Sequence, residues 1–176
     1  MKSDVMLIDN QGNGFEDCVR MAESYGESQS LGRKQTIQLK MITQEMLSLA
    51  RSVTGEMQAS FWIENEGRSF SLYMTTNTVL DKDKRYQLIS SATSRRNEIA
   101  TTFLGKLRDA FEQAMTAEAD HDYDLPQYLE KDVGHIIEDP EWDGFERSVL
   151  RGISDDIRIA IRGREVRMTV SKSFAE

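Results

Sequence analysis

Few side chains in this sequence are placed to perform chemistry, and the one in the most suggestive setting is Glu45. It lies in the stretch TQEMLSLARS, residues 43–52, about 70° from the centre of a helical apolar stripe. That stripe consists of Leu39, Ile42, Met46, Leu49 and Val53. A glutamate in this position either reaches water at the edge of a packed helix or serves as a catalytic base. The structural role is the simpler interpretation.

Cys18, the only cysteine, is the one candidate nucleophile of its kind. Its position on the predicted helix is mainly polar, and no histidine shares its helical face, so we expect an unreactive thiol. The glycine-containing stretch QGNG, residues 11–14, lacks the lysine that a phosphate-binding loop requires.

The stretch DHDYD, residues 120–124, resembles the start of a calcium loop. Counted from Asp120, the sixth and twelfth positions are Leu125 and Lys131, where such a loop needs Gly and Glu. A site built from His121 and His135 with carboxylates is the alternative, although their spacing matches no standard ligand pattern. We expect a solvated acidic loop and no metal site.

Composition indicates a soluble globular protein. The chain has 176 residues, 39% of them hydrophobic, and a mean hydropathy of -0.54. No apolar run approaches the roughly 20 residues of a membrane span. The first residues contain only a four-residue apolar run, Val5 to Ile8, which predicts no secretory signal. With a single cysteine, these features predict a cytoplasmic protein without a membrane partner.

The negative charge is concentrated in one segment. Residues 120–143 hold nine acidic residues against Lys131, a sum of -8 that equals the net charge of the chain. The rest contains 21 acidic and 21 basic residues. We therefore expect one domain, residues 1–176, with an acidic inserted loop at 120–143. An acidic chain of this kind is a poor nucleic-acid binder.

Hydrophobic periodicity predicts helices at 14–26, 32–53 and 98–117, and hairpins at 57–74 and 157–170. Short helices are also expected at 81–92 and 142–152. The predicted fold class is α+β, a two-layer sandwich with helices packed on one face of a mixed or antiparallel sheet. Each hairpin has a polar side, so the other sheet face is expected to be open to solvent or to a partner.

The last hairpin carries a group of arginines on or near one sheet face: Arg158, Arg162, Arg164 and Arg167, with Lys172 beyond them. A solvated face with cross-strand charge compensation is the expected role. The alternative is a docking face for an acidic partner, or for the acidic segment of this chain. No aromatic residue interleaves with the arginines, so we expect no nucleic-acid platform.

The order of elements resembles that of the anti-sigma-factor-type serine kinases, which belong to the histidine-kinase-like ATPase (GHKL, or Bergerat) superfamily. The similarity covers residues 15–75 and 144–174, about half of the chain. It implies a Bergerat-like fold and magnesium-ATP chemistry. Glu45 stands at the position of the family's catalytic glutamate, and Leu49 at that of its magnesium-binding asparagine.

Other family motifs are missing. Where an Asp-x-Gly-x-Gly box is expected, the chain reads TTNTVLDKD from Thr75, and Asp81 comes several residues late. The glycine-rich lid also has no counterpart, since SATSRRNEIATTFLGKL offers only Gly105. We therefore expect no cofactor. Binding of Mg-ATP, with help from Arg95 or Arg96, is the alternative.

Three functions follow from these observations. The first is a non-catalytic or weakly nucleotide-binding regulatory protein that acts by binding a protein partner. The second is an active ATP-dependent serine kinase that uses Glu45, with Asp81 or Asp83 taking over adenine or metal contacts. The third is a structural homo-oligomer, such as a homodimer, formed through the hairpin faces.

Overall fold

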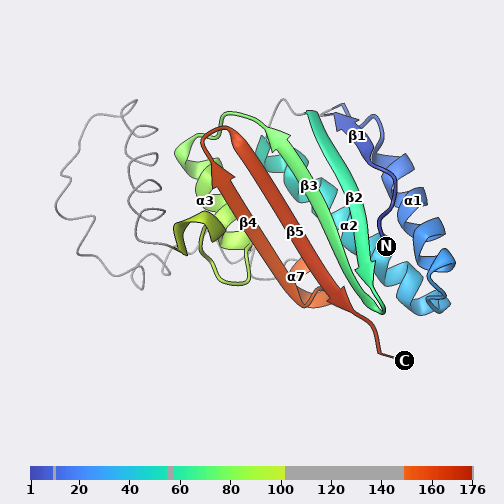
Figure 1. Ribbon diagram of the computed structural model, residues 1–176. Helices are drawn as coiled ribbons and strands as arrows, with labels where there is room; N and C mark the ends of the chain where they lie inside the picture. Colours follow the sequence, from blue (N-terminus) through green and yellow to red (C-terminus); the bar gives the residue numbers. More distant parts are fainter. Residues whose placement is uncertain (10, 55–57, 102–148, 176) are drawn as a thin grey trace, which may run out of the picture.

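The computed structural model describes residues 1–9, 11–54, 58–101 and 149–175. It forms an α+β two-layer arrangement in which the helices lie on one face of a five-stranded antiparallel sheet, as predicted (Figure 1). The elements are β1 (Met6–Asp9), α1 (Phe15–Ser28), α2 (Arg33–Thr54), β2 (Gln58–Glu66), β3 (Ser69–Asn77), α3 (Lys82–Ser91), η1 (Glu98–Thr101), α7 (Val149–Ile153), β4 (Asp156–Arg162) and β5 (Glu165–Ser173).

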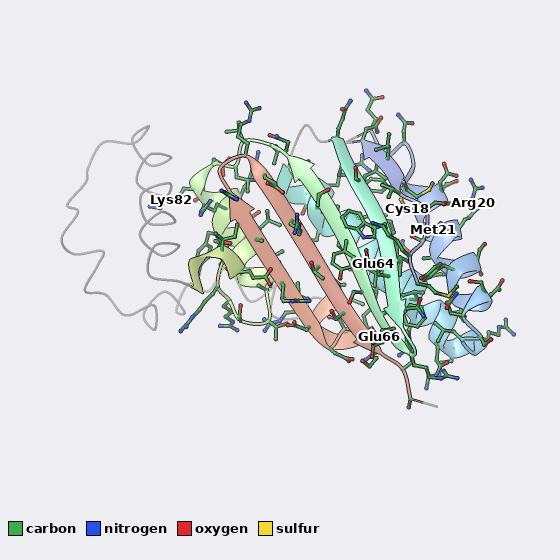
Figure 2. All side chains as sticks on the ribbon, in the orientation of Figure 1. Cys18, Arg20, Met21, Glu64, Glu66 and Lys82 are labelled. Carbon is green, nitrogen blue, oxygen red and sulfur yellow. The ribbon has the colours of Figure 1, made fainter. Side chains whose placement is uncertain are left out.

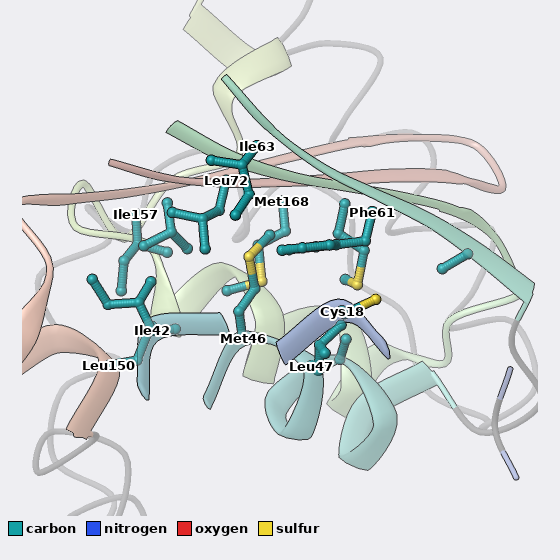
Figure 3. Packing of buried hydrophobic residues seen from close by; sticks show 14 of the residues in the cluster. Cys18, Ile42, Met46, Leu47, Phe61, Ile63, Leu72, Leu150, Ile157 and Met168 are labelled. Atoms are coloured by element: carbon teal, nitrogen blue, oxygen red, sulfur yellow. The ribbon is translucent and has the colours of Figure 1, made fainter. Parts of the chain in front are cut away.

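The sheet has the strand order β1-β2-β3-β5-β4. Both predicted hairpins are present, and the pairing of β3 with β5 joins them into one sheet, with Tyr73 opposite Thr169. Apolar residues alternate along the strands, so that Phe61, Leu72 and Met168 all face the helices and are buried there (Figure 3). Burial of this one face is the main source of stability.

Helix α2 crosses the middle of the helical layer. It contacts α1 on one side and α7 and α3 on the other (Figure 1). At the crossing with α1, a Cβ on Gly26 would lie 3.4 Å from the side chains of Leu31 and Leu39. The small residue therefore allows the two helices to approach closely.

Strand β1 was not predicted, because its four residues are too few to show an alternating pattern. It pairs with β2 at the edge of the sheet and buries Ile8. Gly14 lies against its free edge, with φ of 83°. A Cβ on this residue would come within 2.3 Å of the Leu7 carbonyl oxygen, so both the space and the backbone conformation require glycine.

Two of the predicted helices lie only partly within the described residues. The helix expected at 98–117 begins as a 3-10 turn, Glu98–Thr101, and the rest of it lies outside the described residues. Of the helix expected at 142–152, the described part is helical at Val149–Ile153. The acidic segment 120–143 also lies outside the described residues.

The outer edge of β4 is covered by residues 93–97, which bond it through side chains and backbone, rather than by another strand. The Asn97 amide donates to the Ile161 carbonyl oxygen at 2.9 Å and accepts from the Ile161 backbone N–H at 2.9 Å. Thr93 bonds the Ile157 carbonyl through its backbone N–H and accepts from the Ile157 N–H through its hydroxyl, at 2.8 and 2.7 Å. Asn97 thus takes the place of a peptide group, which satisfies an edge that would otherwise be free to pair.

We predict that Asn97→Ala lowers the free energy of unfolding by about 2–4 kcal/mol, because it leaves two buried backbone groups without partners. Urea denaturation monitored by circular dichroism measures this. The matched control is Asn77→Ala, the same change at an exposed position at the end of β3, for which we expect a loss below about 0.5 kcal/mol. Equal losses for the two variants would contradict the edge-sealing role.

Candidate functional site

Glu45 lies half-buried on the flank of α2, on the side away from the sheet. The buried residues of this helix are Thr36, Leu39, Ile42, Thr43, Met46, Leu47 and Ala50. By the 100° step of an α-helix, their centre lies about 140° from Glu45, twice the angle expected from the sequence. Within the described part of the chain, the carboxylate makes no hydrogen bond or ion pair. Glu45 therefore lies on the side of α2 opposite its buried face, and not at the edge of the apolar stripe as expected.

Leu49 occupies the position at which the family resemblance requires a metal ligand. Its side chain is partly buried and packs against the hydrophobic core. The predicted stripe was therefore correct in including Leu49 but wrong about its centre, which lies nearer Thr43, Leu47 and Ala50. An apolar side chain with these contacts contributes to packing and offers no atom to a cation.

Asp81 was the alternative group for adenine or metal contacts, and it has a structural partner. Its side chain accepts a hydrogen bond from the Lys84 backbone N–H at 2.8 Å, which caps the N-terminus of α3. Its other carboxylate oxygen lies 3.7 Å from the Lys84 ammonium group. Asp83 is exposed in the first turn of the same helix, where its negative charge interacts favourably with the helix dipole.

Cys18 was placed on a mainly polar helical position, and this was wrong. The thiol is completely buried between α1 and the core, because the buried face of α1 is centred on Cys18, Ala22 and Gly26 (Figure 3). Burial, with a smaller contribution from the charge of Asp17, raises the pKa of the thiol to about 12. The expected low reactivity thus has a different cause: the thiol is both inaccessible and protonated.

No metal site is apparent in the part of the chain that the structure describes: no three or more His, Cys, Asp or Glu side chains gather there. His121 and His135 lie outside the described residues, as does Gly105. The helices within the described ranges are also too short or too polar to span a membrane.

The exposed face of the sheet carries the most distinctive group of polar and aromatic side chains. Trp62 on β2 and Tyr73 on β3 are directly opposite each other, and their rings stack with centroids 5.2 Å apart and planes at 11°. The Lys2 ammonium group lies 4.7 Å from the centroid of the Trp62 ring on the same face. Sequence reasoning missed this pair, although both residues occupy outward positions of the predicted hairpin.

The same row continues onto the second hairpin. Tyr73 on β3 stands opposite Thr169 on β5, and Thr169 stands opposite Arg158 on β4. The β3–β5 pairing therefore brings aromatic and basic side chains into one row across the sheet. The aromatic residues that seemed absent from the arginine group come from the other hairpin. Arg158 lies 3.5 Å from Glu98 and 3.3 Å from Asp156. Asp156 is on the same strand and Glu98 is in η1, so the charge is compensated locally and not across strands as predicted.

The remaining basic residues of the hairpin divide between the two faces. Arg162 and Arg167 lie on the exposed face, where they line an open hollow of about 320 Å³ with Glu98, Ile99, Ala160 and Glu165. Lys172 was wrongly grouped with them: it stands opposite the buried Phe70 and bonds Asp155 at 2.7 Å. Burial raises the pKa of Asp155, but hydrogen bonds from Lys172 and the Ser173 N–H outweigh this and lower it overall.

No protein-family model matches this chain, and no curated protein matches it.

We predict that Leu49→Asn lowers the free energy of unfolding by about 2 kcal/mol, because it removes packed apolar atoms and brings an amide to the core boundary. The control Ser48→Asn places the same side chain at the exposed neighbouring position and should change stability by less than about 0.5 kcal/mol. Chemical denaturation of both variants measures the difference. If Leu49→Asn is as stable as the control, Leu49 does not contribute to the core.

We also predict that Cys18 resists thiol reagents at pH 8 in the native protein and reacts fully in denaturant. A thiol with a pKa of about 12 holds its proton at this pH, and raising the pH toward 9 should add little reactivity while the fold persists. Labelling followed by intact mass spectrometry measures this. Rapid labelling of the native protein would show that the thiol is accessible.

Proposed function

We propose that the protein is a non-catalytic regulatory protein that acts by binding another protein through the exposed face of its sheet. The single observation that carries the proposal is the packing of Leu49 against the core at the position where a nucleotide-dependent relative needs its metal ligand. Phosphoryl transfer from ATP depends on a bound metal that neutralises charge on the phosphates. With Leu49 in this position, the α2 flank supports packing rather than catalysis.

Kinship with the histidine-kinase-like ATPases is part of the proposal. The order of helices and hairpins in the described residues agrees with it, and so does the position of Glu45 on the second helix. Asp81 adds support for a non-catalytic role, because a carboxylate that caps α3 is already engaged with its own helix. A cytoplasmic setting belongs to the same proposal, since the single thiol is buried and has no cysteine partner in the sequence.

The exposed sheet face is proposed as the binding surface because of its residue types. Tryptophan, tyrosine and arginine are the side chains that most often dominate protein interfaces, and this face presents Trp62, Tyr73 and Arg158 in one row. Helices cover the opposite face of the sheet, and among the described elements none covers this one (Figure 1).

An ATP-dependent serine kinase is the second candidate, and one observation favours it. Glu45 is half-exposed and has no partner among the described residues, as a base awaiting a substrate would be. In this alternative, Glu45 would polarise the attacking hydroxyl.

Titration with Mg-ATP separates the two candidates. We expect millimolar Mg-ATP to raise the melting temperature of the wild-type protein by less than about 1 °C, and Glu45→Ala to behave in the same way. Glu27→Ala, a change at an exposed glutamate of α1, is the matched control. A rise of more than about 3 °C in the wild type, together with ATP hydrolysis that Glu45→Ala abolishes and Glu27→Ala retains, would overturn the proposal in favour of the kinase.

A further inference from the structure

The exposed sheet face has an acidic corner at the turn between β2 and β3. Glu64 and Glu66 are outward residues at this end of β2 (Figure 2). Glu64 is engaged locally, since it accepts from the Trp62 indole at 2.9 Å and lies 3.5 Å from Lys2. Glu66 is exposed and has no partner among the described residues. The nearby Arg68 is turned to the helical layer, where it donates to Gln35.

A basic corner lies diagonally opposite, at the turn between β4 and β5. It consists of Arg162, Arg164 and Arg167. The guanidinium groups of Arg162 and Arg164 have no carboxylate within ion-pair distance in the described part of the chain. That of Arg167 lies 3.6 Å from Glu165 on its own strand, a contact that is weak at an exposed site. This corner therefore carries a net positive charge.

Opposite charges at diagonal corners make the face complementary to itself. A two-fold axis that lies in the interface and runs between the other two corners exchanges the acidic and basic corners. Glu66 of each copy then meets Arg162 and Arg164 of the other copy. Such an axis makes the strands of the two sheets cross at about 90°, which is one of the two common geometries for packed sheets. The contact is isologous, as most homodimer contacts are.

The size and the centre of the face suit such a contact. The 38 residues of the five strands, at a rise of about 3.3 Å and a spacing of about 4.8 Å, cover roughly 600 Å². A standard interface buries about 800 Å² on each partner. The stacked Trp62 and Tyr73 lie near the centre, and Leu7, which is 77% exposed, adds an apolar contact at the edge.

We propose that the exposed sheet face binds a second copy of this chain, as a two-fold homodimer that pairs Glu66 of one copy with Arg162 of the other. The inference rests on the proposed function only in taking this face as the binding surface. It names the partner and the charges that select it. Because the β4 edge of the sheet is covered and Gly14 lies against Leu7 at the β1 edge, association uses the face rather than the addition of strands.

Sedimentation velocity of the purified chain over a wide range of concentration tests this proposal. We expect a monomer–dimer equilibrium that weakens at high salt. Glu66→Arg and Arg162→Glu should each raise the dissociation constant at least tenfold, because each places like charges together twice across the two-fold axis. The double variant Glu66→Arg/Arg162→Glu restores opposite charges and should return to within about threefold of the wild type.

Glu27→Arg and Arg33→Glu are the matched controls, since they make the same charge changes at exposed positions of the helical layer. Both should dimerise like the wild type, and circular dichroism should show every variant folded. A monomer at all concentrations would overturn the proposal. So would a double variant that dimerises no more tightly than the weaker of the two single variants. Either result leaves the Mg-ATP test untouched, so the regulatory function would stand or fall separately.

Discussion

The pairing of β3 with β5 is the interaction on which the rest of the structure depends. It joins two hairpins whose paired residues lie about a hundred positions apart in the sequence, such as Ser69 and Ser173. Without it, each hairpin would be an isolated ribbon of marginal stability with one apolar side exposed. With it, Leu72 and Val170 become neighbours in a single buried face, and the helices have a continuous surface on which to pack.

Much of this fold could be predicted because its signals are local. Alternation of apolar residues defined both hairpins, and helical spacing defined α1 and α2. Strand β1 could not be found in this way, because four residues show no period. The centre of the buried face of α2 was also misplaced, since Thr43 and Ala50 give weak hydrophobic signals but are fully buried.

The candidate site was less predictable, because it depends on pairings between distant segments. The sequence indicates that Trp62 and Tyr73 point outward, but their contact depends on the register of the hairpin, in which Trp62 stands opposite Tyr73. Their proximity to Arg158 depends on the β3–β5 pairing, which no local pattern specifies. The environment of Cys18 was mispredicted for a related reason: its neighbours in the sequence are polar, whereas its neighbours in space are apolar.

Residues 93–97 occupy the outer edge of β4, and this limits the kinds of assembly that the protein can form. A sheet with a free edge can add strands without limit, and such growth leads to fibres. Here Asn97 and Thr93 occupy the hydrogen-bonding groups of β4, and Gly14 brings the chain against β1 at the other edge. Growth in the plane of the sheet is therefore blocked at β4 and hindered at β1, where Gly14 lies against Leu7. Contacts through the face alone produce closed assemblies of fixed size.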